Sequence, residues 1–313
     1  MKIFESLAAL PQIKKPVVTI GTFDGVHLGH QKILEQLKLE AKVIDGETVL
    51  LTFHPHPRVV LFPNNHGIQL LQTMEEKFQA LKENGLENII VLPFTEVFSN
   101  LTAEEFTRKI LFETLHCTKV VIGYDHQFGR NREGNIEYLR TVSSKYNFEV
   151  IEIPAKSIDE INVSSTKIRE SLLKGDVETA KLFLSRPYQL TGIVVKGDQL
   201  GRTIGFPTAN ISINSDTKII PANGVYAVKA LVDAVSYFGM MNIGIRPTVD
   251  SGNQLKLEVH LFDFCQDIYD NEVTILFEKH IRLEKKFPNL DELKNAIAND
   301  EEYCRRFFGL PLV

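Results

Sequence analysis

Two histidines lie three residues apart in a glycine-rich stretch, Gly21-Thr22-Phe23-Asp24-Gly25-Val26-His27-Leu28-Gly29-His30. Glycine lets the backbone come close to a ligand, and imidazole nitrogens donate hydrogen bonds to phosphate oxygens. A metal pair is disfavoured, because no His-Glu-x-x-His motif and no nearby cysteine accompanies them. The stretch predicts a nucleotide phosphate site, although two ordinary hydrogen-bonded histidines at a helix start stay open. The candidate residues are Gly21, Phe23, Asp24, Gly25, His27 and His30.

A second glycine-rich turn, Gly201-Arg202-Thr203-Ile204-Gly205-Phe206-Pro207-Thr208-Ala209-Asn210, lies in the other half of the chain. The Thr208 hydroxyl and the Asn210 amide oxygen are hard ligands that suit Mg²⁺ bound together with ATP phosphates. These side chains also bond their own backbone in many turns, and that reading stays open. The candidate residues for ATP are Gly201, Gly205, Pro207, Thr208 and Asn210, with Thr208 and Asn210 as the metal ligands.

Glu258 lies in an alternating stretch, Leu255-Lys256-Leu257-Glu258-Val259-His260-Leu261. The apolar odd-numbered residues share one face of a strand, so Glu258 points to the other face beside Lys256 and His260. The alternatives are a solvated carboxylate and a general base that takes a proton from an alcohol.

Two further loops carry unusual residues where predicted strands end, Phe53-His54-Pro55-His56-Pro57 and Gly123-Tyr124-Asp125-His126-Gln127-Phe128-Gly129. The prolines fix the backbone of the first loop. Phe53 and Phe128 could stack on a planar ring, or they could pack in the core.

Strands alternate with helices from residue 17 to about residue 150, which predicts an α/β domain with a parallel sheet. In such sheets ligands bind beyond the carboxyl ends of the strands, where the histidines and phenylalanines above fall. From Tyr188 onward, alternating strands separated by turns predict a small antiparallel β-barrel, followed by a C-terminal helix over 290–308. We expect domains at 1–183 and 184–313.

Composition limits the function. The 313 residues, 43% hydrophobic and 24% charged, suit two globular domains, and a net charge of −5 argues against a dedicated nucleic-acid binder. No apolar run is long enough to cross a membrane. Cys117, Cys265 and Cys304 are isolated, which predicts reduced thiols and a cytoplasmic protein. A weak homo-oligomer stays open.

Residues 1–183 resemble the Rossmann-like nucleotidyltransferase module of bacterial FAD synthetases, on the four segments around His27, Phe53, Asp125 and Ser165. The resemblance implies that His27 and His30 hold the α-phosphate of ATP during attack by the FMN phosphate. It implies that Ser165, Thr166 and Arg169 hold the departing phosphates. The implied flavin-binding residues are Phe53, Pro55, Asp125 and Phe128.

The chain departs from this family at His126-Gln127, where the usual pattern has Phe-Arg. If the missing arginine contacts a phosphate, a charge-assisted hydrogen bond is lost. Arg130 and Arg132 lie close enough in sequence to replace it. One alternative function is therefore a kinase whose first domain has lost adenylylation.

The second half resembles riboflavin kinase, on Pro207-Thr208-Ala209-Asn210, Gly224-Val225-Tyr226 and Leu257-Glu258-Val259-His260. The resemblance implies that Thr208 and Asn210 hold Mg-ATP and that Glu258 deprotonates the ribityl 5′-hydroxyl of riboflavin. The whole chain is then similar to a bifunctional enzyme that makes FMN and FAD from riboflavin and ATP. A flavin- or nucleotide-responsive regulator without turnover is the second alternative.

Overall fold

The computed structural model describes residues 1–8, 10–62, 67–153, 163–197, 200–248 and 252–312. The chain divides into two compact units, Met1–Ser165 and Thr166–Val313. This division falls before the boundary expected between residues 183 and 184. The expected boundary separates two functional domains, and it stays a prediction. It places two helices, α8 (Ser165–Leu173) and α9 (Val177–Leu184), almost wholly with the second unit.

The first unit is built on a six-stranded sheet in which every neighbouring pair is parallel, in the order β1-β4-β3-β2-β5-β6. Its central strands β2 and β5 are buried along their whole length, as expected when helices cover both faces. The strands are β1 Lys2–Phe4, β2 Val17–Ile20, β3 Thr48–His54, β4 Asn88–Pro93, β5 Lys119–Gly123 and β6 Glu149–Ile153.

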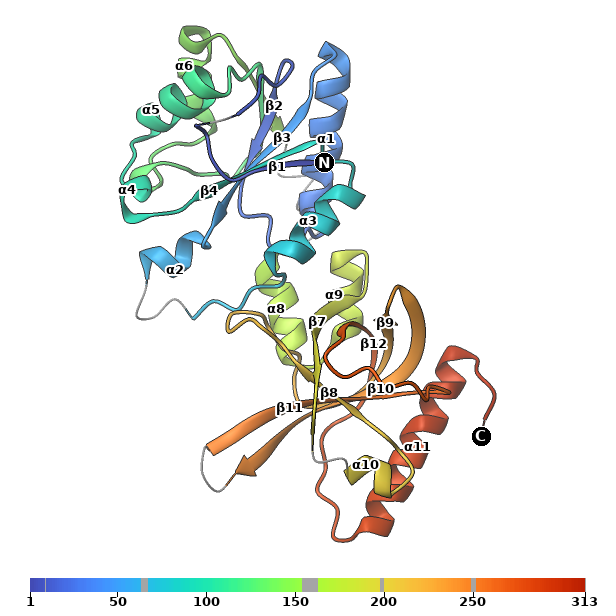
Figure 1. Ribbon diagram of the computed structural model, residues 1–313. Helices are drawn as coiled ribbons and strands as arrows, with labels where there is room; N and C mark the ends of the chain where they lie inside the picture. The colour runs from blue at the N-terminus through green and yellow to red at the C-terminus, as the bar shows by residue number, and fades with distance from the viewer. Residues whose placement is uncertain (9, 63–66, 154–162, 198–199, 249–251, 313) are drawn as a thin grey trace. The chain divides into compact units, whose positions relative to one another are not determined.

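Helices cover the two faces of this sheet, with α1 and α3 on one side and α5 and α6 on the other (Figure 1). A separate hydrophobic cluster fills each face, one around Leu34 and Leu81 and the other around Phe106 and Leu139. The helices are α1 Leu28–Ile44, α2 Pro57–Leu61, α3 Met74–Glu83, α4 Glu96–Ser99, α5 Ala103–Phe106, the π-helix η1 Thr107–Thr114, the 3₁₀ turn η2 Arg130–Arg132 and α6 Ile136–Tyr146.

Local sequence signals set several of these helix starts. The Thr-x-x-Glu patterns at Thr73 with Glu76 and at Thr102 with Glu105 both form capping boxes, with the reciprocal side-chain to backbone bonds that define them. The helix that begins after Thr102 continues as a π-helix over Thr107–Thr114, a feature that no residue pattern in the segment indicates.

The second unit contains a closed six-stranded antiparallel barrel, in the order β10-β11-β8-β7-β12-β9. Figure 1 shows α11 running along the outside of this barrel. The predicted fold class is therefore confirmed for both halves. The elements are β7 Tyr188–Val195, α10 Leu200–Thr203, β8 Ala209–Ser212, β9 Gly224–Val232, β10 Val235–Thr248, β11 Gly252–Leu261, β12 Glu272–Arg282 and α11 Leu290–Phe308.

One strand of the barrel has little signal in the sequence. Four residues with two polar side chains, as in β8, do not stand out as a strand. Closure requires it, since β8 pairs with β7 on one side and β11 on the other.

No helix among the described residues is long and apolar enough to cross a lipid bilayer.

Candidate functional sites

The turn between β2 and α1 brings the two histidines of the first unit into contact. His27 caps α1, its Nδ1 accepting a hydrogen bond from the backbone N–H of His30 at 3.4 Å. The two rings stack with centroids 3.7 Å apart, and the Phe23 ring stacks on His30 at 4.5 Å. Because Nδ1 of His27 is an acceptor, a neutral His27 carries its hydrogen on Nε2, where it can be donated to an anion.

Buried charges support this turn from beneath. Asp24 is 3% exposed, and both of its carboxylate oxygens lie within hydrogen-bond distance of the Leu71 backbone N–H, at 3.0 and 3.1 Å. Lys77, on α3, is buried and donates from Nζ to the Thr22 carbonyl at 3.0 Å. Burial lowers the pKa of Lys77, and the nearby Asp24 carboxylate opposes that shift. The sequence pattern did not single out Lys77.

A cavity of about 600 Å³ lies at the carboxyl ends of the strands of this unit. It brings together eight of the candidate residues of the first half, namely Gly21, Phe23, His27, His30, Phe53, Asp125, Phe128 and Ser165. Three described candidates, Asp24, Gly25 and Pro55, do not line it. Thr166 and Arg169 belong to the second unit, so their predicted contact with this site stays a prediction.

An aromatic wall bounds part of the cavity. Phe53 packs against Phe94 and Phe98 with ring centroids 5.6 and 5.5 Å away, and all three residues line the cavity. Phe94 and Phe98 follow β4 along the chain, and sequence reasoning did not include them among the candidates. The sequence does contain a signal for them. Phe94-x-x-x-Phe98 directly follows β4, and Phe53 lies at the end of the neighbouring strand β3.

The loop that departs from the family pattern contains a buried imidazole nitrogen. His126 stacks near Phe128, with ring centroids 6.1 Å apart, and its Nε2 is buried without a hydrogen-bond partner among the described residues. Burial lowers the pKa of His126 from 6.5 to about 4, against the opposing effect of Asp125. The folded protein therefore holds this side chain neutral at pH 7.

Replacing His126 by Phe is expected to stabilise the first unit. The change removes a buried nitrogen that lacks a hydrogen-bond partner. At pH 7 this is expected to raise the free energy of unfolding by about 1 kcal/mol and the melting temperature by about 2–4 °C. Because the pKa of His126 is lower in the folded state, its protonation in the unfolded chain lowers wild-type stability as the pH falls from 6.5 toward about 4, and the variant lacks this contribution. Calorimetry at pH 7 and pH 5 measures both effects.

The exposed His54 provides the control, since His54→Phe removes a histidine that the fold does not bury. An unchanged pH dependence in His126→Phe would show that the buried ring is not the group that titrates.

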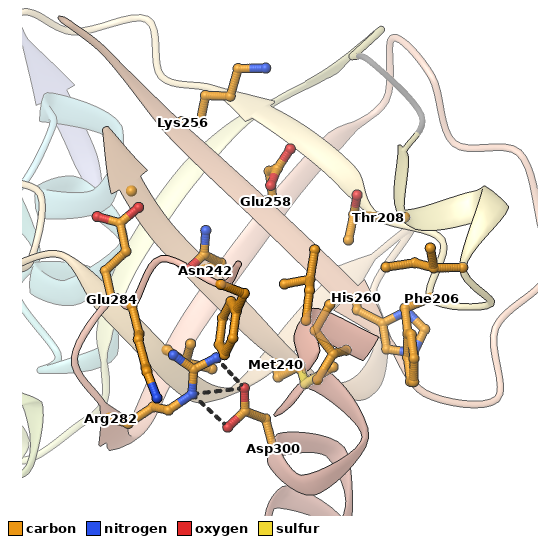
Figure 2. Close-up of a pocket in the computed structure, with 18 of the residues that line it drawn as sticks. Phe206, Thr208, Met240, Asn242, Lys256, Glu258, His260, Arg282, Glu284 and Asp300 are labelled. Carbon is orange, nitrogen blue, oxygen red and sulfur yellow. Dashed lines mark hydrogen bonds and ion pairs between the residues drawn. The ribbon is translucent and has the colours of Figure 1, made fainter. Parts of the chain in front are cut away.

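In the second unit, a cavity of about 430 Å³ lies between the outer wall of the barrel and α11. Leu257, Val259 and Leu261 are buried, and the alternate residues Lys256, Glu258 and His260 line the cavity, as the alternation in β11 predicts. Figure 2 shows the Glu258 carboxylate between Asn242 and Thr208.

Strand register explains this grouping. Glu258 is opposite Asn242 on β10 and opposite Asn210 on β8. Directly opposed side chains lie on the same face of a sheet, so all three carry their polar groups to one side of the barrel wall. Asn242 was not among the residues predicted for this site, because its pairing with Glu258 depends on a register that the sequence does not show.

Glycines close the turn that leads to Thr208. The Phe206 backbone N–H donates to the Gly201 carbonyl at 2.8 Å, and a Cβ at Gly201 would lie 2.2 Å from the Phe206 carbonyl oxygen. At Gly197, a Cβ would lie 2.0 Å from the Asn210 amide nitrogen. Side chains at these two positions would displace the turn or the Asn210 amide.

A second cavity, of about 480 Å³, lies on another side of the same turn, and Pro207 and Thr208 line it together with the 264–269 loop. Thr208 also lines the cavity that contains Glu258, so it borders both spaces. The structure thus places Gly201 and Thr208 in the Glu258 cavity and Pro207 in the second one. Of the described candidates, Gly205 and Asn210 line neither cavity.

Ion pairs fasten α11 beside the Glu258 cavity. Arg282 on β12 donates from its guanidinium to both carboxylate oxygens of Asp300, at 2.7 to 3.1 Å (Figure 2). Arg305 on α11 is 4% exposed and pairs with Asp263, which lies beyond β11, and with Glu301 on its own helix. The pairs with Asp300 and Asp263 join the helix that forms one wall of the cavity to the rest of the unit.

Among the described residues, no group of three or more His, Cys, Asp or Glu side chains is arranged to hold a metal ion. Thr208 and Asn210, the candidate ligands in the second unit, and the nearby Glu258 offer oxygen atoms as donors. Such hard oxygens suit Mg²⁺ shared with phosphates better than Zn²⁺.

Two family models match this chain in succession. One, described as FAD synthetase, matches residues 10–167, and the other, described as riboflavin kinase, matches residues 184–308.

Similar proteins span nearly the full length. The bifunctional riboflavin kinase/FMN adenylyltransferase of Buchnera aphidicola subsp. Schizaphis graminum (strain Sg) is 39% identical, over 99% of this chain and 100% of its own. The Escherichia coli (strain K12) protein of the same name is 36% identical over 99% of both chains. A crystal structure of a protein named macrolide-efflux protein, from Streptococcus pneumoniae, is 32% identical and covers 97% of this chain and 98% of its own, with a TM-score of 0.88.

Proposed function

This chain belongs to the bifunctional riboflavin kinase/FMN adenylyltransferase family, and from that premise we propose which residues carry each reaction. The enzyme phosphorylates riboflavin to FMN with ATP, and it adenylylates FMN to FAD with release of pyrophosphate. The observation that supports the assignment of residues is the presence, in each unit, of a cavity that gathers that unit's candidate side chains.

In the second unit, Glu258 is the general base for riboflavin phosphorylation. Its carboxylate takes the proton of the ribityl 5′-hydroxyl while that oxygen attacks the γ-phosphorus of ATP, and ADP leaves. The cavity beneath α11 has apolar walls from Met240, Leu293 and Ile297, which suit the flavin ring. The second cavity, on the other side of Thr208, suits the nucleotide. Thr208 then lies where the transferred phosphoryl group passes between the two substrates.

Thr208 and Asn210 would hold Mg²⁺. The fit rests on their oxygen donors and on the strand register that places Asn210 beside Glu258. When bound, the ion neutralises charge on the ATP phosphates.

In the first unit, His27 and His30 hold the α-phosphate of ATP. The FMN phosphate attacks the α-phosphorus, and pyrophosphate leaves in line. Charge builds on the phosphate oxygens, and donors already fixed at a helix N-terminus stabilise it without reorganising. Phe53, Phe128 and Ser165 line the same cavity. The two phenylalanine rings suit the flavin ring, and Ser165 is proposed for the departing phosphates, as are Thr166 and Arg169 on the resemblance alone.

Arg132 replaces the cation that this chain lacks at position 127. It lines the cavity of the first unit, whereas Arg130 does not. Arg132 has a positive φ of 60°, and the preceding Asn131 also has a left-handed backbone, with φ of 55°. This geometry supports retention of adenylylation over the alternative of a kinase that has lost it.

A product assay tests the proposal. Purified protein incubated with riboflavin, ATP and Mg²⁺ is expected to form FMN and then FAD, and with FMN and ATP to form FAD and pyrophosphate, each resolved by chromatography. Chelation by EDTA is expected to stop both reactions, and added Mg²⁺ to restore them. Absence of FAD in the FMN reaction would favour the kinase alone.

The cytoplasmic location, the weak homo-oligomer and the absence of nucleic-acid and membrane partners stay predictions from composition.

A further inference from the structure

His260 connects three elements around the kinase cavity. It is on β11, two residues from Glu258 and on the same face, and its side chain lines the same cavity. Its Nδ1 lies 2.7 Å from the carbonyl oxygen of Pro207, and its Nε2 lies 3.8 Å from Oε2 of Glu301 on α11. Since a carbonyl oxygen only accepts, the Nδ1 atom of His260 carries the hydrogen of this bond.

Packing fixes the orientation of the ring. His260 is buried, with its ring edge-on to Phe206 at 5.7 Å and to Phe262 at 5.8 Å. Figure 2 shows the His260 ring beside Phe206, which precedes Pro207 in the turn. A buried imidazole held on two sides can direct its Nδ1–H at one acceptor only.

The acceptor belongs to the peptide unit that leads into Thr208. The Pro207 carbonyl and the Thr208 N–H lie in one rigid plane, so a bond to that oxygen sets the orientation with which Thr208 enters the cavity. The same histidine is two residues from Glu258 along a hydrogen-bonded strand. Its ring therefore sets the distance between the proposed base and the turn proposed to hold Mg-ATP.

We propose that His260 is a positioning residue for phosphoryl transfer, fixing the Pro207–Asn210 turn relative to Glu258 through its Nδ1–H. It does not exchange a proton with either substrate. The proposal rests on the roles proposed for Glu258 and Thr208. A displacement of about 1 Å between reacting groups costs about 100-fold in rate, so a large effect on kcat is expected from a residue that touches neither reacting atom.

Asn and Gln substitutions test the direction of the bond. The amide nitrogen of Asn occupies nearly the position of Nδ1, and that of Gln nearly the position of Nε2. We expect His260→Ala and His260→Gln to lower kcat for riboflavin phosphorylation about 100-fold, with KM for riboflavin within about threefold. His260→Asn is expected to retain kcat within about fivefold of wild type, because it still donates to Pro207.

Equal kcat values in the Asn and Gln variants would overturn the proposal, as would an undiminished kcat in the Ala variant. Loss of packing alone lowers kcat to a similar extent in the Asn and Gln variants. The ratio of their two kcat values therefore remains informative even where both proteins are less stable.

Two further variants separate the possible causes. Glu301→Gln weakens the contact with Nε2 and the ion pair with Arg305 inside α11, but it leaves both the Pro207 bond and the Arg305–Asp263 pair. We therefore expect kcat to stay within about threefold of wild type. A large loss in Glu301→Gln would place the effect in α11 rather than in the turn and would overturn the proposal. Glu258→Gln, assayed in the same series, tests the proposed base independently of His260. FAD formation from FMN reports on the first unit and should remain unchanged in every variant.

Discussion

Riboflavin phosphorylation is expected to fall by about 10²–10⁴-fold in Glu258→Gln, in kcat rather than in KM. Glutamine has nearly the same shape as glutamate and keeps a polar side chain opposite Asn242 and Asn210 in the strand register. It cannot accept the proton of the ribityl hydroxyl. The loss therefore isolates proton transfer from substrate binding, and the initial rate of FMN formation measures it.

The fold provides the controls for this variant. Glu272 is an exposed carboxylate on β12, and Glu272→Gln is expected to leave both reactions unchanged. FAD formation from FMN by Glu258→Gln should equal that of wild type, because residue 258 lies outside the first unit. A rate of riboflavin phosphorylation within about tenfold of wild type would remove Glu258 from the role of base.

Local patterns predicted the parts of the sites that depend on neighbours in sequence. The face of Glu258 follows from the two-residue period of a strand, and the structure confirms that Leu257 and Val259 are buried behind it. The starts of α3 and α5 follow from capping residues within three positions of each other. Such signals are short-range, so one sequence is sufficient to read them.

Other parts depend on contacts between distant segments. Asn242 reaches Glu258 through the pairing of β10 with β11, and neither residue indicates the register. Lys77 looks like a solvent-facing helix residue, yet Asp24 and the Thr22 carbonyl lie next to its buried ammonium group. Asp24 is predicted as an ATP-binding residue, and that role stays a prediction. The contact that the sequence does not indicate is the one between its carboxylate and the backbone N–H of the distant Leu71.

The resemblance to known families added what local patterns could not. It brought residues near Ser165 together with His27, and the structure places Ser165 in the same cavity, its hydroxyl donating to the Asp24 carbonyl at 2.9 Å. It gave no indication of the second cavity beside Thr208, because that space is formed by a loop at 264–269 that none of the quoted motifs includes.

FAD formation is expected to fall by about 10²–10³-fold in His30→Ala, the range for removing one preorganised donor to a developing oxyanion. His30 is preferred to His27 because the His27 side chain also caps α1, so replacing His27 would weaken the helix as well. The backbone N–H of residue 30 still donates to His27 in the variant. Initial rates of pyrophosphate release from FMN and ATP measure the effect, and riboflavin phosphorylation is expected to remain at the wild-type rate.

His30→Phe distinguishes donation from packing. The rings of Phe23, His27 and His30 form one stack, and phenylalanine continues that stack without a nitrogen. If His30 acts by donating to the α-phosphate, the Phe and Ala variants lose FAD formation to a similar extent. If the Phe variant keeps the wild-type rate, the stack alone is sufficient, and the phosphate-binding role of His30 is wrong. Because a stacked imidazole pair can place both of its donors on one anion, the first result is the one expected if the pair binds a single phosphate.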